Sequence, residues 1–344
     1  MELANETLVD SGGYLKNKAL LDLPEALCEP FNPHEIFSTM APLDFDQLAP
    51  LTPEAKKYAL YYGLDMQGRV SGVRHYLGYF SSAAYRLACH VYLKDSAKAT
   101  VILLHGYYDH VGLYRHVIKR LLQLDFNVLA YDLPGHGLSS GGRAQIDGFH
   151  EYSDALRNCI KLIKDKLPKP LYFVGQSTGG AIALDYLFDA ELERCSVDFE
   201  KVVLLAPLHR PVQWRKNLML YHAIKFFAKS LERKFVPSSH DLSFLRFVKE
   251  QDPLQSQVVT LSWVGSLHEW IVKTDSAVRC QFPLVVIQGK EDQTVDWEKN
   301  IPYFSDKFPK ITVHYIDEGR HHLANESKPI RNKMLEYLSS ALTD

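Results

Sequence analysis

The segment Gly175-Gln176-Ser177-Thr178-Gly179 limits the fold more than any other part of the chain, because it joins two stretches of opposite character. The residues before it, at 171–174, form a short apolar run typical of a buried strand, and those at 181–188 have helical periodicity. In isolation the segment would be an ordinary Gly/Ser turn at a helix N-cap. Between a strand and a helix it is typical of a nucleophile elbow, in which small residues allow a tight turn that exposes the serine hydroxyl. It therefore predicts Ser177 as a nucleophile above an α/β sheet.

The rest of the chain alternates in the way that such a sheet requires. Short apolar runs lie at 100–104, 127–131, 171–174, 202–205, 284–287 and 311–316, and helical patterns at 114–124, 152–166, 181–188 and 329–341. Continuous apolar runs fit strands that are buried on both faces, as in a parallel sheet. Before them, runs at 73–79 and 85–93 are rich in aromatic and β-branched residues, and we expect a hairpin with its turn at Ser81-Ser82.

The alternation breaks once, between Pro207 and Leu284, where about seventy residues read as helices and predict an inserted subdomain. The predicted divisions are an N-terminal extension of unknown role at 1–65, a first core part at 66–207, a helical cap at 208–270 and a second core part at 271–344. The extension contains a helical stretch at 53–62, and we expect it to pack on the core or to be partly flexible.

Charge and composition exclude several classes of function. The net charge is −2 and no long basic run occurs, so nucleic acid is not an expected partner. The five cysteines are scattered without a C-x-x-C pair, which predicts free thiols in a reducing compartment. The N-terminus lacks the pattern of a secretory signal, and no apolar run approaches the roughly 20 residues of a membrane-spanning helix. We therefore expect a cytoplasmic protein, with peripheral membrane attachment open; no feature indicates an oligomeric state.

A nucleophilic serine needs a base, and the base needs an orienting acid; after a nucleophile elbow the acid precedes the histidine in the chain. Asp292 follows the run at 284–287 and is preferred to Glu291 and Asp296, because it directly follows the short turn that leaves the strand. Glu291 or Asp296 would then be a surface charge or a helix N-cap. The run at 311–316 is followed by two adjacent histidines, His321 and His322, which composition alone does not separate.

Two backbone amides are candidates for the oxyanion hole. Tyr107 follows His105-Gly106 at the end of the apolar run 100–104, and Thr178 follows the nucleophile. His105 itself is expected to hold loop backbone through its ring nitrogens. Asp132 and His136, in the segment DLPGHG, are interpreted as parts of a turn stabilised by an Asx-type hydrogen bond and are left out of the catalytic set.

With these motifs in their observed order, the chain resembles the monoacylglycerol lipase and lysophospholipase group of α/β-hydrolases. The matching segments are LLHG at 103–106, YDLPGHGLSSG at 131–141, GQSTGG at 175–180, LLAP at 204–207, QGKED at 288–292 and EGRHHLANE at 318–326. The resemblance, which covers about residues 75–344, implies an α/β-hydrolase fold: a mostly parallel central sheet flanked by helices, with a helical cap inserted after the sixth core strand. It implies Asp292 as the acid and, counted from the glycine of the last motif, His322 as the base. The chain departs from the group at Tyr107-Tyr108-Asp109, where a tyrosine pair could narrow the acyl pocket.

The cap stretch that begins at Trp214 is amphipathic. Leu220, Ile224, Phe227 and Leu231 recur at helical spacing, with basic residues around them. One interpretation is a lid helix whose apolar face packs on the domain or lines the pocket; another is a lid that also rests on an anionic membrane surface. The candidate pocket residues are Tyr108, Trp214, Leu220, Ile224 and Phe227.

These features together predict a serine hydrolase that cleaves an acyl ester of a lipid such as a monoacylglycerol or a lysophospholipid, through an acyl-enzyme and without a cofactor or metal. A peptidase or thioesterase on the same fold is the alternative, since the triad chemistry is shared. Two remote alternatives are a non-catalytic binding protein and a metallohydrolase, the latter suggested by the run from His105 to Asp109-His110.

Overall fold

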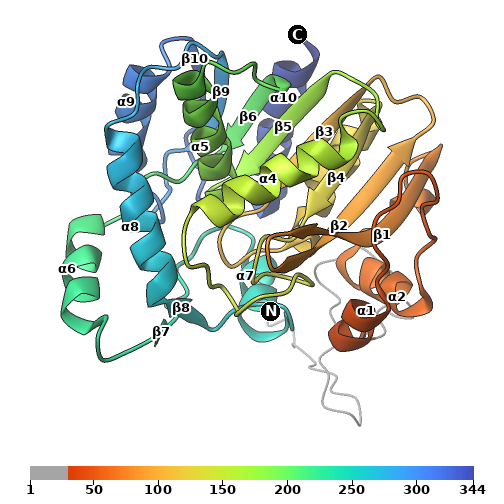
Figure 1. Ribbon diagram of the computed structural model, residues 1–344, viewed down its shortest axis with the longest axis horizontal. Coiled ribbons are helices and arrows are strands. Elements are labelled where there is room, and N and C mark those ends of the chain that lie inside the picture. Colours follow the sequence, from red (N-terminus) through yellow and green to blue (C-terminus); the bar gives the residue numbers. More distant parts are fainter. Residues whose placement is uncertain (1–29) are drawn as a thin grey trace, which may run out of the picture.

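A twisted sheet of eight strands forms the centre of the computed structural model, which describes residues 30–344 (Figure 1). The strand order is β1-β2-β4-β3-β5-β6-β9-β10. All neighbours pair in parallel except β2, which is antiparallel to β1 and β4. The strands are β1 (Val73–Ser82), β2 (Tyr85–Lys94), β3 (Ala99–Leu104), β4 (Phe126–Tyr131), β5 (Leu171–Gln176), β6 (Phe199–Leu205), β9 (Leu284–Gly289) and β10 (Ile311–Ile316). The predicted mostly parallel sheet is confirmed.

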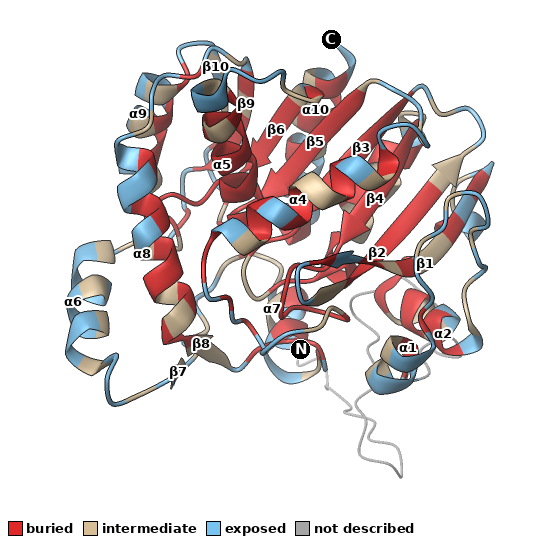
Figure 2. Cartoon of the chain, viewed as in Figure 1, coloured by how far each residue is buried: buried red, intermediate tan, exposed pale blue. Residues whose placement is uncertain are grey.

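The central strands are apolar throughout because both of their faces are covered (Figure 2). Successive side chains of a strand point to opposite faces, so β3 sends Val101 and Leu103 into one core and Ile102 and Leu104 into the other. The helices are α1 (Pro33–Thr39), α2 (Pro53–Tyr62), α3 (Arg115–Gln123), α4 (His150–Ile163), α5 (Thr178–Glu193), α6 (Trp214–Ile224), α7 (Leu242–Glu250), α8 (Leu261–Asp275), α9 (Trp297–Lys307) and α10 (Lys328–Thr343). Apolar residues of α1, α2, α3, α7 and α10 pack into the first core and those of α4, α5, α8 and α9 into the second.

The connections of β3 and β5 decide where a site can form. These two strands are neighbours in the sheet, yet the helix after β3 packs on one face and the helix after β5 on the other. In open α/β sheets, ligands bind beside the carboxyl ends of strands at such a switch in direction. The carboxyl ends of β3 and β5 carry Gly106 and Ser177, which were the sequence candidates for the oxyanion turn and the nucleophile.

The hairpin of β1 and β2 forms as predicted, but its turn was misplaced by two residues. Ser81 and Ser82 belong to β1 and pair with Arg86 and Tyr85. The turn lies at Ala83 and Ala84, where Ala83 takes a left-handed φ of 49°. Serine is common in turns, but here the cross-strand pairing extends β1 through both serines.

The insertion between β6 and β9 is less helical than expected. Besides α6, α7 and α8 it contains a two-stranded antiparallel sheet of β7 (Ser230–Glu232) and β8 (Val258–Thr260). The predicted long helix stops at Ile224, and Leu231 pairs with Val259 in this small sheet. The predicted end of the cap at residue 270 falls inside α8. The divisions at 208 and 270 otherwise stay predictions.

The described part of the N-terminal extension packs on the core, which was one of the two arrangements expected from the sequence. The predicted helix at 53–62 is confirmed as α2, whose Tyr58 and Tyr62 are fully buried in the first core. Residues 1–29, including Cys28, lie outside the described residues. Cys89, Cys159 and Cys280 are buried free thiols, and Cys195 is an exposed one. Within residues 30–344, none of the helices has the length and apolarity needed to cross a bilayer.

Candidate active site

Ser177 occupies a sharp turn between β5 and α5. Its φ of 51° and ψ of −111° are strained for a residue with a side chain. Glycine is required on both sides: a Cβ on Gly175 would lie 2.6 Å from the carbonyl carbon of Gly179, and a Cβ on Gly179 would lie 2.5 Å from the carbonyl oxygen of Leu104. The backbone at Ser177 therefore has the tight turn of a nucleophile elbow. Ser177 itself is largely buried at the end of β5.

Asp292 is the only one of the three acidic candidates that contacts a histidine of the predicted pair. Its Oδ2 accepts hydrogen bonds from His321 Nδ1 at 2.8 Å and from Gln288 Nε2 at 3.2 Å. Its Oδ1 accepts from the N–H groups of Thr294 and Val295 at 2.8 and 3.1 Å. Because both oxygens are held, the carboxylate is fixed in orientation.

The other two acids have the surface roles considered for them. Glu291 is half-exposed and lies 3.3 Å from His240 Nε2. Asp296 is the N-cap residue of α9 and pairs with Lys299 at 2.5 Å.

The histidine that Asp292 contacts is His321, whereas the sequence resemblance implies His322 as the base. Side chains of successive residues leave the backbone in different directions, and the path of this loop decides which ring meets the acid. The loop is held from the cap, since His322 N–H donates to Ser238 O at 2.8 Å and Ser239 Oγ donates to Asn325 O at 2.8 Å. These contacts come from residues more than eighty positions earlier in the chain, so nothing in the local sequence distinguishes the two histidines.

The protonation of His321 is set by two opposing effects. Burial lowers the pKa of the imidazole, but the charge and hydrogen bond of Asp292 together outweigh it and raise the pKa above its ordinary value. Nδ1–H donates to the carboxylate, which leaves Nε2 as the nitrogen able to accept a proton. The loop also contacts the elbow directly, because Gln176 Nε2 donates to His321 O at 3.3 Å.

His322 belongs to a second buried network beside the first. Its Nε2 lies 3.2 Å from Asp109 Oδ2, and its ring packs edge-on against Phe244. The same carboxylate oxygen accepts a hydrogen bond from Tyr114 Oη at 2.8 Å. Burial raises the pKa of Asp109, but the electrostatic interaction with His322 and the hydrogen bond from Tyr114 prevail and lower it. The ring of His322 thus faces Asp109 and not Asp292.

The turn after β3 lies close to the nucleophile. A Cβ on Gly106 would lie 3.3 Å from Ser177 Cβ and 3.1 Å from Asp109 Oδ2. The ring of Tyr107 stacks on Trp263 of α8 with 3.7 Å between centroids, which fixes the residue whose N–H is the proposed oxyanion donor. Thr178 is the first residue of α5, so its N–H has no acceptor within the helix. Both amides remain candidates for the oxyanion hole.

His105 has the structural role that was expected. Its Nδ1–H donates to Gly106 O at 2.8 Å, and its Nε2 accepts from the N–H of Leu133 at 2.9 Å. Burial lowers the pKa of this histidine to about 3, so it stays neutral. Asp132 likewise accepts from backbone, at Val111 N and Leu138 N, and holds the loop that contains His136.

Two of the five predicted pocket residues do not line a pocket. Leu220 is 49% exposed on α6, which lies at the edge of the molecule and has no buried residue, and Phe227, in the turn after that helix, is 88% exposed. Of the two interpretations of their apolar spacing, an inward face does not hold for these two side chains, which face outward. Tyr108 follows Tyr107 in the candidate oxyanion turn, and the centroids of the two rings lie 4.2 Å apart. Trp214 and Ile224 are half-buried, and their place in a pocket stays a prediction.

The run His105 to Asp109-His110 does not bring its side chains to one point. His105 is bonded to backbone, Asp109 pairs with His322, and His110 Nε2 lies 2.9 Å from Asp252 Oδ2. Among residues 30–344, no three His, Cys, Asp or Glu side chains form a group that could hold a metal ion.

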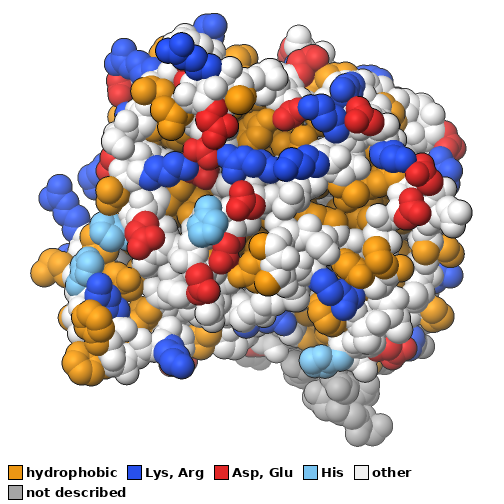
Figure 3. Space-filling model, viewed as in Figure 1, with side chains coloured by type: hydrophobic (Ala, Val, Ile, Leu, Met, Phe, Trp, Pro, Cys, Tyr) orange, Lys and Arg blue, Asp and Glu red, His pale blue; other side chains and the backbone are white. Residues whose placement is uncertain are grey.

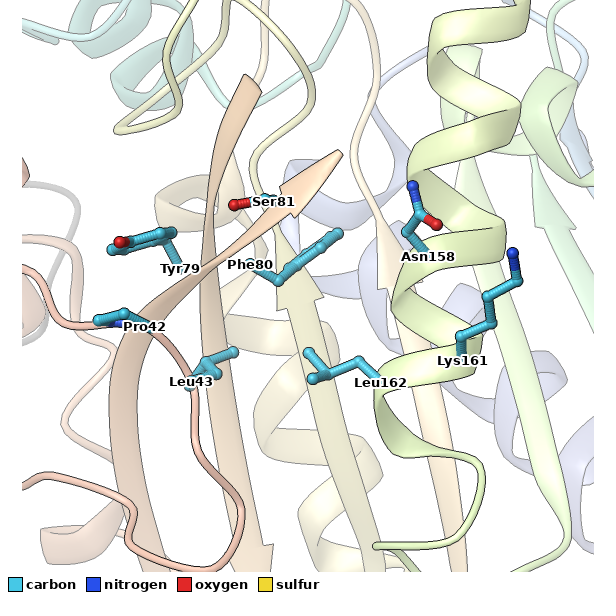
Figure 4. A pocket seen from close by; sticks show the side chains of 8 residues that line it. All are labelled: Pro42, Leu43, Tyr79, Phe80, Ser81, Asn158, Lys161 and Leu162. Carbon is cyan, nitrogen blue, oxygen red and sulfur yellow. The ribbon is translucent and has the colours of Figure 1, made fainter. Parts of the chain in front are cut away.

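A separate hollow of about 430 Å³ lies beside the edge strand β1 (Figure 4). It is lined by Pro42, Leu43, Tyr79, Phe80, Ser81, Asn158, Lys161 and Leu162, from the N-terminal segment, β1 and α4. None of these residues is among the candidates for catalysis, and β1 is separated from β5 by three strands. The hollow is therefore distinct from the candidate active site.

Known proteins match most of the chain. The family described as "Serine aminopeptidase, S33" matches residues 95–328. Rat monoglyceride lipase is 34% identical over 257 residues, covering 71% of this chain and 82% of the rat protein. Human monoglyceride lipase is 37% identical over a shorter stretch of 112 residues, covering 32% of this chain and 35% of the human protein.

More distant proteins extend the similarity. Phospholipase YtpA of Bacillus subtilis is 24% identical over 240 residues, covering 66% of this chain and 89% of that protein. The solved structure of monoglyceride lipase from Saccharomyces cerevisiae superposes with a TM-score of 0.66 at 16% identity, covering 78% of this chain and 95% of that one. At this low identity the superposition shows the fold alone, which is that of α/β-hydrolases.

Proposed function

Because the chain belongs to the serine aminopeptidase S33 family and is a serine ester hydrolase, we propose that it hydrolyses a lipid acyl ester, a monoacylglycerol or a lysophospholipid, through an acyl-enzyme at Ser177. The observation that carries the proposal is the Asp292–His321 hydrogen bond of 2.8 Å at the same sheet edge as the strained Ser177 turn. A buried carboxylate that orients one imidazole nitrogen leaves the other to act as a base.

In the proposed reaction His321 Nε2 takes the proton of Ser177 as Oγ attacks the ester carbonyl carbon. The tetrahedral oxyanion is stabilised by the N–H groups of Tyr107 and Thr178. The ester C–O bond then breaks, and His321 returns the proton to the leaving alcohol. Water hydrolyses the acyl-enzyme by the same steps, which releases a fatty acid and restores Ser177.

The lipid nature of the substrate is supported by the relatives, which are named as monoglyceride lipases and a phospholipase. The surroundings of the proposed oxyanion turn agree with an acyl chain, since Tyr107, Tyr108 and Trp263 form an aromatic cluster there. Burying each CH₂ group of a chain contributes about 0.8 kcal/mol. The name of the matching family supports an alternative function, that of an aminopeptidase.

A hydrolysis panel tests the substrate class. Purified protein is offered a monoacylglycerol, a lysophospholipid, p-nitrophenyl esters of increasing chain length, an acyl thioester and an aminoacyl amide. We expect the two lipids to give the highest kcat/KM and the p-nitrophenyl esters to improve with chain length. A preference for the amide or the thioester would replace the proposal by a peptidase or a thioesterase.

The pH profile of an Asp292→Asn variant tests the proposed acid. We expect kcat to fall by about 10⁴-fold, because the imidazole loses both its orientation and the charge that stabilises its protonated form. The Asp292 carboxylate raises the pKa of His321, so its removal leaves burial to lower that pKa. The acid limb of kcat/KM should therefore shift to lower pH. Asp296→Asn is the matched control, with an unchanged limb; an unshifted limb in Asp292→Asn would exclude Asp292 as the partner of the base.

We also propose that the cap contacts an anionic lipid surface through an outer patch formed by Met219, Leu220, Lys225, Phe226 and Phe227. Met219 near the end of α6 and Phe226 and Phe227 in the turn after it are 73%, 81% and 88% exposed, which is unusual for large apolar side chains grouped in one short segment. Hydrophobic side chains gather over this end of the molecule in Figure 3. Lys225 Nζ lies 5.2 Å from the Phe226 ring, and Arg215, Lys216 and Lys229 are exposed nearby in the chain. Apolar side chains with cations beside them suit the boundary between acyl chains and anionic headgroups.

Flotation with vesicles of phosphatidylserine and phosphatidylcholine tests this contact. A Phe226→Ser, Phe227→Ser double variant should lose most of its vesicle binding while it keeps its hydrolysis of a monomeric short-chain ester. Leu192→Ser is the matched control, since Leu192 is 69% exposed at the far end of α5. Equal binding by the double variant and the control would refute the patch as the contact.

A further inference from the structure

Arg233, which directly follows β7, places a cation beside the proposed oxyanion turn. The carbon of its guanidinium group lies 4.0 Å from the ring centroid of Tyr108 and 4.3 Å from that of Phe235. Tyr108 follows Tyr107 in the chain and has a left-handed φ of 72°, and the turn closes with a hydrogen bond from Asp109 N–H to Gly106 O. The stacking therefore links the cap cation to the turn whose amide is proposed to bind the oxyanion.

The guanidinium group is held in place on one side only. Nη1 donates to Gln255 Oε1 at 2.6 Å and to Ser256 O at 3.3 Å, and Gln255 in turn donates to Asp252 Oδ2 at 3.1 Å. The Arg233 N–H donates to Gln257 O, so the backbone is also fixed. Within the described part of the chain, the side-chain hydrogen bonds of Arg233 all come from Nη1. Nε and Nη2 are left to donate to a further acceptor.

The positive charge of Arg233 is not matched by a carboxylate. None of the ion pairs formed among residues 30–344 includes it. Asp109 and Asp252 are the acids that act on it electrostatically, and each already pairs with a histidine, His322 and His110. Burial lowers the pKa of Arg233, as expected for a cation removed from water without a direct partner. A stacked, oriented guanidinium group with free N–H donors is suited to bind a phosphate.

We infer that Arg233 binds a phosphate group on the alcohol part of the ester, so that this site prefers a lysophospholipid to a neutral monoacylglycerol. The inference rests on the proposed function and selects between its two substrates. The aromatic turn at Tyr107 and Tyr108 would contact the acyl ester, and the cap cation would contact the headgroup next to it. The reaction is unchanged: the acyl C–O bond is cleaved, and the phosphate leaves intact on the alcohol.

The experiment compares two esters that differ by the phosphate alone, 1-octanoylglycerol and 1-octanoylglycerol 3-phosphate, both kept below the concentration at which they aggregate. We expect wild-type protein to have the higher kcat/KM on the phosphate ester. Arg233→Gln should lower that value by about 10- to 100-fold, the effect of charge-assisted hydrogen bonds, with less than about a threefold change on the neutral ester. On the phosphate ester, Arg233→Lys should have a kcat/KM between those of the wild type and Arg233→Gln, since lysine keeps the charge but loses the paired N–H donors of the guanidinium group. Arg279→Gln, which removes an exposed arginine paired with Asp306, is the control and should change neither rate.

A second measurement uses the wild-type protein, so that it does not depend on the folding of a variant. Glycerol 3-phosphate should inhibit hydrolysis of the neutral ester competitively, and glycerol at the same concentration should not. Equal loss on both esters in Arg233→Gln, or no difference between the two inhibitors, would overturn the inference and leave the lipid hydrolase proposal standing. Hydrolysis of neither ester by the wild-type protein would instead refute the proposed function itself, and the inference with it.

Discussion

Replacing His321 with glutamine is expected to lower kcat by about six orders of magnitude, whereas the same change at the neighbouring His322 should leave most of the activity. Glutamine has no nitrogen that can take up a proton, so the variant at 321 loses the base that Asp292 orients. At 322 the side chain contacts Asp109 through a ring nitrogen, and glutamine can still donate a hydrogen bond to that carboxylate. Steady-state kinetics on the best substrate of the panel measures both effects.

The two variants control for each other, since they make one chemical change at adjacent positions of one loop. Thermal unfolding separates folding from catalysis. We expect both variants to keep a cooperative unfolding transition, because glutamine can still donate a hydrogen bond to the carboxylate that each histidine contacts. The reverse result, with His322→Gln inactive and His321→Gln active, would restore the histidine that the sequence resemblance implies and would contradict the role inferred from the Asp292 hydrogen bond.

Ser177→Ala is the second change with a very large expected effect, again about six orders of magnitude in kcat. The methyl side chain removes the oxygen that attacks the ester, and the strained turn keeps its neighbouring glycines, so the fold should stay intact. Labelling by a fluorophosphonate probe should disappear with the activity, since the probe reacts with the activated serine.

Ser276→Ala is the matched control for the nucleophile. Ser276 is exposed at the end of α8 and its hydroxyl donates to Lys273 O, so its loss should leave both labelling and turnover unchanged. Full turnover by Ser177→Ala would remove Ser177 from the mechanism. Loss of labelling in the Ser276 variant would mean that the probe reports on a different serine.

The sheet and the elbow were predictable because their causes are local. Strands such as β5 and β9 are buried on both faces. Each therefore appears in the sequence as a short continuous apolar run, which can be recognised without knowledge of the neighbouring strands. Gly175 and Gly179 leave no room for any side chain, so the turn at Ser177 follows from the residues within it. Asp292 directly follows its strand and stays at the sheet edge beside His321, while Asp296 begins α9, so the preference for Asp292 as the acid rests on a local feature of the sequence.

The sequence by itself thus determined the layered α/β sheet, the strained serine turn and the acid beside it, all of which depend on residues close together in the chain. Only the tertiary structure decided which of His321 and His322 meets Asp292, because the loop that carries them is held by Ser238 and Ser239 of the cap. It also decided which face of α6 meets solvent. A helical period in the sequence shows that one face of a helix is apolar, but it does not show what covers that face. The same is true of Arg233, whose stacking on Tyr108 joins residues 125 positions apart and has no trace in the local pattern.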